Sequence, residues 1–213
     1  MRRDANNIEE VTVFQGLPND ILERLKNDCQ ISVYPEGATL RGVVSRPLLV
    51  LDGMFCARMN KSPQVLLVSG NLLLPQVFFP DTAVITALSE EERSQSMRSQ
   101  RYTCIGKTCV ATFSFELFDE LLNEPVFARN VLTNNLNLME QMGVYQRFLY
   151  HSTAKDAVEY ILKLSHALKI DHLTHSQIAF MTGRNRTTVT KAMHEIALSN
   201  PQLFEEAPLR IGE

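Results

Sequence analysis

The hydrophobic pattern of this chain changes once, near Ser114, and this change limits the folds open to it. Before it, short apolar runs rich in Val, Ile, Leu, Thr and Phe are separated by Gly or Pro, which is typical of strands. After it, apolar residues recur every three or four positions, as they do along helices. The pattern predicts a small barrel or sandwich followed by helices. The expected elements are a first helix over 19–28 and strands over 31–34, 48–51, 54–59, 65–68, 82–88 and 103–113.

Two local features belong to the expected strand region. Asp52 and Gly53 lie between two runs and predict a hairpin turn, because Gly readily adopts positive φ. Cys104 and Cys109, if they share one strand, point to opposite faces and do not pair. The four cysteines are scattered without Cys-x-x-Cys spacing, which favours reduced structural thiols over a disulfide scaffold or a zinc ribbon.

A helix of roughly 25 residues is expected to begin at Pro125 and to run to about Tyr150. One stripe along it has the alternating four-three spacing of a coiled-coil seam, and its single asparagine would fix the register. We expect this seam to form a homodimer, although the spacing equally fits two stripes buried within one chain. The seam consists of Val131, Asn135, Leu138, Met142, Tyr145 and Leu149. The second stripe, expected to pack on the strands, consists of Leu132, Leu136 and Met139.

Helix-capping signals divide the last third of the chain. Thr153 begins another helix, and we place a domain border near residue 151. Thr174 opens a short helix, and Gly183 ends it because a helix C-terminus often needs positive φ. Asn185 then caps a second helix, expected to run from Arg186 to about residue 197. Two helices joined by a tight Gly turn predict a helix-turn-helix, although similar helix pairs also occur as plain core elements.

The composition around this pair favours DNA binding. The chain has a net charge of −3, but residues 172–194 contain no acidic residue. On the second helix, Arg186 can bond guanine, threonines can touch a thymine methyl or a phosphate, and Lys191 can do either. We expect Arg186 to lie nearest a base, and His175 and Thr188 to contact phosphates. The candidate DNA-binding residues are His175, Ser176, Arg184, Asn185, Arg186, Thr187, Thr188, Thr190 and Lys191.

With these motifs the chain resembles the CRP/FNR superfamily of transcription regulators, most specifically over residues 173–179 and 183–189. The resemblance implies an α+β fold: a β-roll (double-stranded β-helix) sensor domain over 1–123, a dimerisation helix over 124–150 and a winged helix-turn-helix over 151–213. It also implies a palindromic promoter site and contact with RNA polymerase. The sequence departs from the family where Thr187 replaces an expected Glu and Lys191 an expected Arg. The segment after Ile196 is also short for a wing.

Several identities of the effector are compatible with the sequence. Cyclic-nucleotide-binding relatives carry a Gly-Glu pair and an Arg segment, whose counterparts here are Gly70, Arg101 and Thr103. The Glu is missing, which argues against cyclic AMP, and an arginine at the start of a strand is commonly just a solvated edge residue. Only Cys29 lies near the N-terminus, which argues against an iron-sulfur cluster. A haem ligand could still come from a Cys or Met in residues 1–150, and an absorbance spectrum decides this.

Other classes of protein fit the sequence less well. The strand region has no His, and we find no phosphate-binding Gly loop, Gly-x-Ser-x-Gly or His-Glu-x-x-His, so we do not expect an enzyme. No run of about 18 apolar residues and no signal peptide is visible, so we expect a cytoplasmic protein without a membrane segment. The rival hypothesis is an interaction module that keeps the fold but recruits a protein partner.

Overall fold

The computed structural model describes residue 8 and residues 10–41, 46–59, 62–74, 100–170 and 173–205. The expected strand 82–88 and residues 206–213 of the expected wing lie outside these ranges. Two four-stranded antiparallel sheets form the centre, in the orders β1-β8-β3-β6 and β2-β7-β4-β5. The strands are β1 (Gln30–Tyr34), β2 (Thr39–Arg41), β3 (Leu48–Asp52), β4 (Met54–Met59), β5 (Ser62–Val68), β6 (Leu72–Leu73), β7 (Gln100–Cys104) and β8 (Thr108–Thr112).

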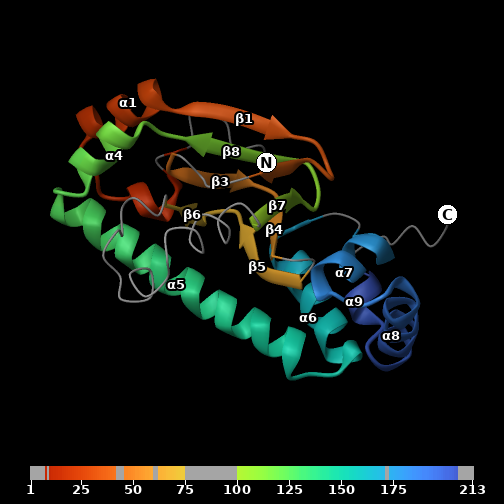
Figure 1. The fold of residues 1–213 in the computed structure, drawn as a ribbon. Helices are drawn as coiled ribbons and strands as arrows, with labels where there is room; N and C mark the ends of the chain where they lie inside the picture. Colours follow the sequence, from red (N-terminus) through yellow and green to blue (C-terminus); the bar gives the residue numbers. More distant parts are fainter. Residues whose placement is uncertain are drawn as a thin grey trace, which may run out of the picture.

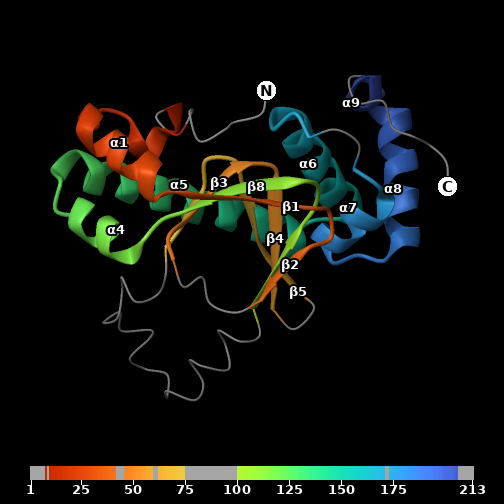
Figure 2. The same cartoon turned by 90° about the horizontal axis from the view of Figure 1, so that it is seen from above.

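Helices lie at the two ends of the sheets and along one side of them (Figures 1 and 2). The 3-10 helix η2 and helices α1 and α4 lie at one end, and α6, α7, α8 and α9 lie at the other. The long helix α5 runs beside both sheets and connects the two ends. Their bounds are η2 (Thr12–Phe14), α1 (Asn19–Asp28), α4 (Phe115–Leu121), α5 (Pro125–Tyr150), α6 (Ala154–Ala167), α7 (His175–Thr182), α8 (Arg186–Ser199) and α9 (Gln202–Glu205). No helix in the described ranges is long and apolar enough to span a membrane.

Strand alternation sorts the apolar side chains into separate cores. On β4, Phe55 and Ala57 face the space between the sheets, whereas Met54 and Cys56 face a core shared with α5, α6, α7 and α8. A third core lies between the other sheet and α1, α4 and the first half of α5, where Phe14, among others, is fully buried. The helical C-terminal region therefore shares a core with the outer face of the β2-β7-β4-β5 sheet.

Two expectations about turns were wrong. Residues 103–113 form two strands in different sheets, β7 and β8, so Cys104 and Cys109 do not share a strand. Gly53 does have positive φ, at 90°, but it joins β3 of one sheet to β4 of the other and closes no hairpin. A Cβ at Gly53 would lie 2.7 Å from the oxygen of Lys107, in the β7–β8 turn. Both turns therefore pass between the sheets at the same corner, an arrangement that the local sequence does not specify.

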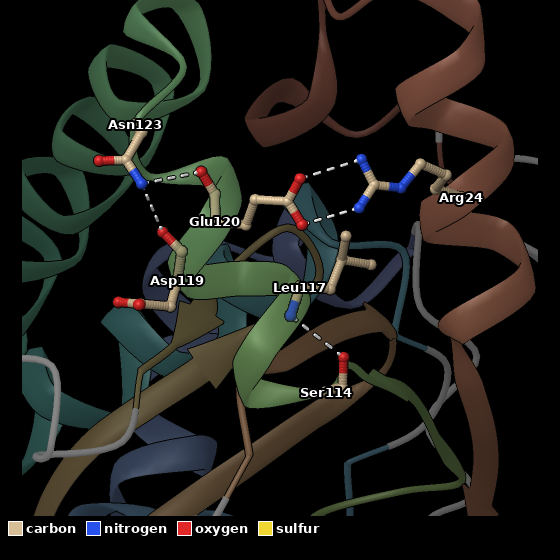
Figure 3. A network of polar contacts seen from close by, with 6 residues as sticks. All are labelled: Arg24, Ser114, Leu117, Asp119, Glu120 and Asn123. Carbon is tan, nitrogen blue, oxygen red and sulfur yellow. Dashed lines mark hydrogen bonds and ion pairs between the residues drawn. The ribbon is translucent and has the colours of Figure 1, made fainter.

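Polar contacts join the two helices at the N-terminal end (Figure 3). Arg24 of α1 donates two hydrogen bonds to the carboxylate of Glu120 on α4, at 3.2 and 2.8 Å. The Ser114 hydroxyl caps α4 by accepting from the nitrogen of Leu117. Asp28, at the end of α1, accepts a hydrogen bond from the nitrogen of Ser114. The Arg24–Glu120 pair is exposed, so it orients the helices more than it stabilises them.

Candidate nucleic-acid interface

The first helix of the expected helix-turn-helix is α7, and side chains close both of its ends. The Thr174 hydroxyl accepts a hydrogen bond from the nitrogen of Gln177, and the Gln177 side chain accepts one from the nitrogen of Thr174. At the other end Gly183 has φ +65°, in the left-handed region. Both features match the sequence expectation, because caps depend on neighbouring residues only.

The second helix, α8, presents one face to the core and the other to solvent. Asn185 caps it by accepting a hydrogen bond from the nitrogen of Thr188 at 2.7 Å. Its inner face is buried against α6 and α7, while the outer face carries hydroxyl and cationic side chains. The buried residues are Val189, Ala192, Met193 and Ile196. The exposed residues include Arg186, Thr187, Thr190 and Lys191.

The other candidate DNA-binding residues have differing surroundings. Ser176 is exposed, and Asn185 is exposed but engaged in capping. Thr188 is half-buried. Arg184 lies apart from the outer face of α8: its guanidinium donates to the main-chain oxygen of Leu149, on α5, and its Nε is buried. His175 lies beside α8, with its Nδ1 3.1 Å from the hydroxyl oxygen of Thr190.

The pair of helices is docked on the sheet, with α7 between the sheet and α8 (Figure 1). Tyr145 of α5 donates a hydrogen bond to the oxygen of Met181, in the last turn of α7. Gln177 donates to the oxygen of Ile105 and, at 2.8 Å, to the carboxylate of Glu36. The guanidinium of Arg58 lies 4.3 Å from the ring centre of Phe180, at cation–π distance. Strands, connecting helix and helix-turn-helix are thus in direct contact.

The expected dimer seam on α5 is largely inside the chain, which corrects our assignment. Val131, Leu138, Tyr145 and Leu149 are at most 7% exposed, each packed against the chain's own strands or helices. Met142 is half-buried against the same cores. Asn135 is half-buried and donates to the oxygen of Val131 within α5. Side chains that already pack within one chain cannot also form a seam with a second.

The second stripe is the exposed one. Leu132, Leu136 and Met139 are 60%, 57% and 67% exposed, although we expected them to pack on the strands. The same four-three spacing continues to Gly143, and Tyr150 follows two turns later with 57% exposure. This stripe has the spacing of a coiled-coil seam and no cover in the described chain.

The choice between the stripes depends on amide side chains that sequence reasoning missed. Asn134 donates to the oxygen of Gly70 at 2.8 Å and accepts from the nitrogen of Leu72 at 3.1 Å. Gln141 donates to the oxygen of Leu66 at 3.0 Å, on β5. Because β5 is an edge strand, its outward carbonyls need donors from elsewhere, and α5 supplies them. The sequence does contain a signal for this face, because Asn130, Asn134 and Gln141 place three amide side chains on one side of the helix.

The candidate effector residues do not come together. Gly70 forms the turn after β5, whose last residue, Val68, pairs with Met54. Arg101 pairs with Arg58, four positions further along β4 and so about 13 Å away. Arg101 is exposed, and Thr103 pairs with Cys56, which faces the core shared with the C-terminal helices and away from the space between the sheets. These residues therefore do not line a shared cavity between the sheets.

No disulfide joins any of the four cysteines, all of which lie in the described ranges, and burial raises the pKa of Cys56 to about 12 and that of Cys29 to about 11. Within the described ranges no cluster of His, Cys, Asp or Glu could hold a metal ion.

Where a wing strand was expected, residues Gln202–Glu205 form α9. A ring nitrogen of His166, on α6, lies 2.7 Å from the main-chain oxygen of Leu203 and forms a hydrogen bond with it.

Solved structures share this fold, although no family model and no curated protein matches the sequence. FixK2 from Bradyrhizobium japonicum is 12% identical, with a TM-score of 0.57 over 80% of this chain and 85% of its own. A regulator assigned to the CRP/FNR family from Eubacterium rectale is 12% identical, with a TM-score of 0.55 over 86% and 85%. The c-di-GMP-responsive regulator CLP from Xanthomonas campestris is 12% identical, with a TM-score of 0.56 over 85% and 93%. The expected fold class is confirmed: the chain has the fold of the CRP/FNR transcription regulators.

Proposed function

We propose that this protein is a dimeric transcription regulator that reads a palindromic promoter site with α8. The observation that carries the proposal is the outer face of α8, where Arg186, Thr187, Thr190 and Lys191 are exposed on a helix that follows a tight turn. No acidic residue occurs from 173 to 194, so no side chain of that segment repels phosphate. Arg186, in the first turn, suits a bidentate contact to guanine. Contact with RNA polymerase and a cytoplasmic location belong to the same proposal.

The fold supports this role, since solved proteins that share it include transcription regulators. We assign dimerisation to the exposed α5 stripe of Leu132, Leu136 and Met139. Two-fold symmetry then presents two copies of α8, which suits an inverted repeat with half-site centres about 10 base pairs apart. An effector bound to the β-roll would act through the contacts between strands, α5 and α7. Its chemistry stays unassigned.

The test begins with selection of duplexes from a random pool by the full-length protein. Affinity is then measured for the selected and a scrambled duplex at two salt concentrations. We expect binding to weaken steeply with salt through counterion release, and Arg186→Ala to lose about 1 to 3 kcal/mol on the selected duplex only. Arg24→Ala removes the same charge from α1, which lies at the opposite end of the molecule (Figure 1), and should leave the preference unchanged.

The alternative, a module that recruits a protein partner, predicts a different result. Wild-type protein would then prefer no duplex, and Arg186→Ala would bind DNA no differently from Arg24→Ala. Either observation would replace the DNA-binding proposal.

A further inference from the structure

The hydroxyl of Thr190 is engaged on two sides, although its side chain lies on the exposed face of α8. Its Oγ1 lies 3.0 Å from the main-chain oxygen of Arg186, one turn earlier in the helix. The same Oγ1 lies 3.1 Å from Nδ1 of His175, which comes from the start of α7. One atom on the outer face of α8 is therefore held by both helices of the helix-turn-helix.

Counting protons assigns a direction to each bond. A threonine hydroxyl has a single proton, and a carbonyl oxygen can only accept, so Thr190 donates to Arg186. Nδ1 of His175 must then be the donor to Thr190, which places a proton on that nitrogen. With its proton committed, the hydroxyl cannot donate to a guanine, to a thymine carbonyl or to a phosphate. The hydroxyl keeps one lone pair that can accept from a base amino group, and the Cγ2 methyl is the part of the side chain that offers a ligand apolar contact.

We propose that Thr190 reads a thymine methyl group and that His175 is the positioning residue that makes it do so. The inference rests on the proposed function and specifies what α8 recognises. The thymine methyl is an apolar group on the major-groove edges of the bases, and it suits contact with another methyl. Arg186 and Thr190 are four residues apart, a rise of about 6 Å, so the thymine lies within about two base pairs of the pair that Arg186 reads.

The test replaces each thymine of the selected half-site in turn with deoxyuridine, which removes the methyl and keeps every hydrogen-bonding group. We expect wild type to lose about fourfold in affinity per half-site at one position, the value for burying one methyl-sized group. Thr190→Ser should bind both duplexes equally, because it lacks the methyl. Thr190→Val keeps a methyl and should keep the preference for thymine.

The role of His175 is tested by the same ratio of affinities. His175→Phe removes the donor, leaves the Thr190 hydroxyl held by the Arg186 oxygen alone and should lower the preference for thymine over deoxyuridine. His175→Asn, whose amide nitrogen takes the place of Nδ1, should restore it. Thr133→Ser is the matched control for Thr190→Ser. Thr133 is exposed on α5, and its hydroxyl makes the same bond to a main-chain oxygen four residues earlier, at 2.9 Å.

The outcomes separate this inference from the proposed function. If wild type selects a duplex but binds deoxyuridine equally well at every position, Thr190 does not read a methyl, and DNA binding stands. If Thr190→Ser keeps the full preference, another side chain contacts the methyl and the inference is wrong. If wild type prefers no duplex at all, both the proposed function and this inference are wrong.

Discussion

The hydroxyl of Tyr145, on α5, donates a hydrogen bond to the main-chain oxygen of Met181, on α7. Tyr145 is 1% exposed, and its oxygen also lies 3.9 Å from Sγ of Cys56. Burial, with a smaller effect of Cys56, raises the pKa of Tyr145, so its hydroxyl keeps the proton that it donates. Met181 lies in the last turn of its helix, where carbonyls have no partner within the helix. One side chain thus joins the connecting helix to the helix-turn-helix.

We expect Tyr145→Phe to lower the free energy of unfolding by about 1 to 3 kcal/mol, because the Met181 oxygen stays buried without its donor. Urea denaturation followed by circular dichroism measures this. Tyr150→Phe is the control: Tyr150 is 57% exposed, and its hydroxyl lies 3.5 Å from the oxygen of Pro63. Equal stability of the two variants would show that the Tyr145 bond does not hold α7.

Features that depend on neighbouring residues could be predicted from the sequence. The bounds of α5, the capping of α6 and α7 and the turn at Gly183 all follow from residues within a few positions of one another. The outer face of α8 followed in the same way, because its spacing separates Val189 and Met193 from Arg186 and Thr190.

Features that depend on distant partners could not be predicted. Both α5 stripes are apolar, and the stripe that turns inward is the one flanked by contacts with distant residues, such as those of Asn134 with Gly70 and Leu72 and of Gln141 with Leu66. An amide on a helix is usually solvated, so nothing local identified these residues as contacts. Likewise Arg184 is a candidate DNA-binding residue from its place in the sequence, but its guanidinium donates to the Leu149 oxygen, 35 positions away.

Gly183 is constrained both by its backbone and by a neighbour. Its φ is +65°, and an added Cβ would lie 3.1 Å from Cδ of Pro63. We expect Gly183→Ala to cost roughly 1 to 2 kcal/mol for the left-handed conformation, and more because of the contact. Gly37→Ala isolates the first effect, since Gly37 has φ +74° and nothing within 4 Å of an added Cβ. Thermal unfolding that ranked Gly37→Ala as the more damaging change would contradict this.

The buried Cys56 thiol makes stability depend on alkaline pH. Burial raises its pKa from 9.0 to about 12, so the folded state keeps the proton after the unfolded state has lost it. The unfolded state then binds fewer protons, and stability falls as pH rises from about 9 to about 12, by on the order of 1 kcal/mol per pH unit. We expect Cys56→Ala to be less stable at pH 7 but to lose stability less steeply above pH 9. An unchanged slope in urea denaturation at pH 8 to 11 would refute this.

The exposed stripe of α5 should hold the dimer together. Leu132, Leu136 and Met139 are more than half exposed in one chain and follow the spacing of a coiled-coil seam, so a second copy can bury all three. In Leu136→Glu, two carboxylates would meet across the two-fold axis, and we expect the molar mass by light scattering to fall from twice that of one chain to that of one. The variant should unfold at the temperature of an isolated wild-type chain, because the Leu136 side chain is already 57% exposed within its own chain.

Two further substitutions test which stripe forms the interface. Asn137→Glu adds the same charge at an exposed position one residue along α5, turned about 100° away from Leu136, and should stay dimeric. Asn135→Leu changes the stripe that packs inside the chain, where Asn135 bonds the oxygen of Val131, and should also leave the molar mass unchanged. If Leu136→Glu stays dimeric and Asn135→Leu becomes monomeric, the interface is formed by the inner stripe, and α5 must move away from the sheets to expose it.

The Leu136→Glu variant also separates dimerisation from DNA reading. Because α8 is remote from the exposed stripe of α5, monomeric Leu136→Glu should keep its preference for the selected half-site. It should lose the affinity that two linked half-sites provide.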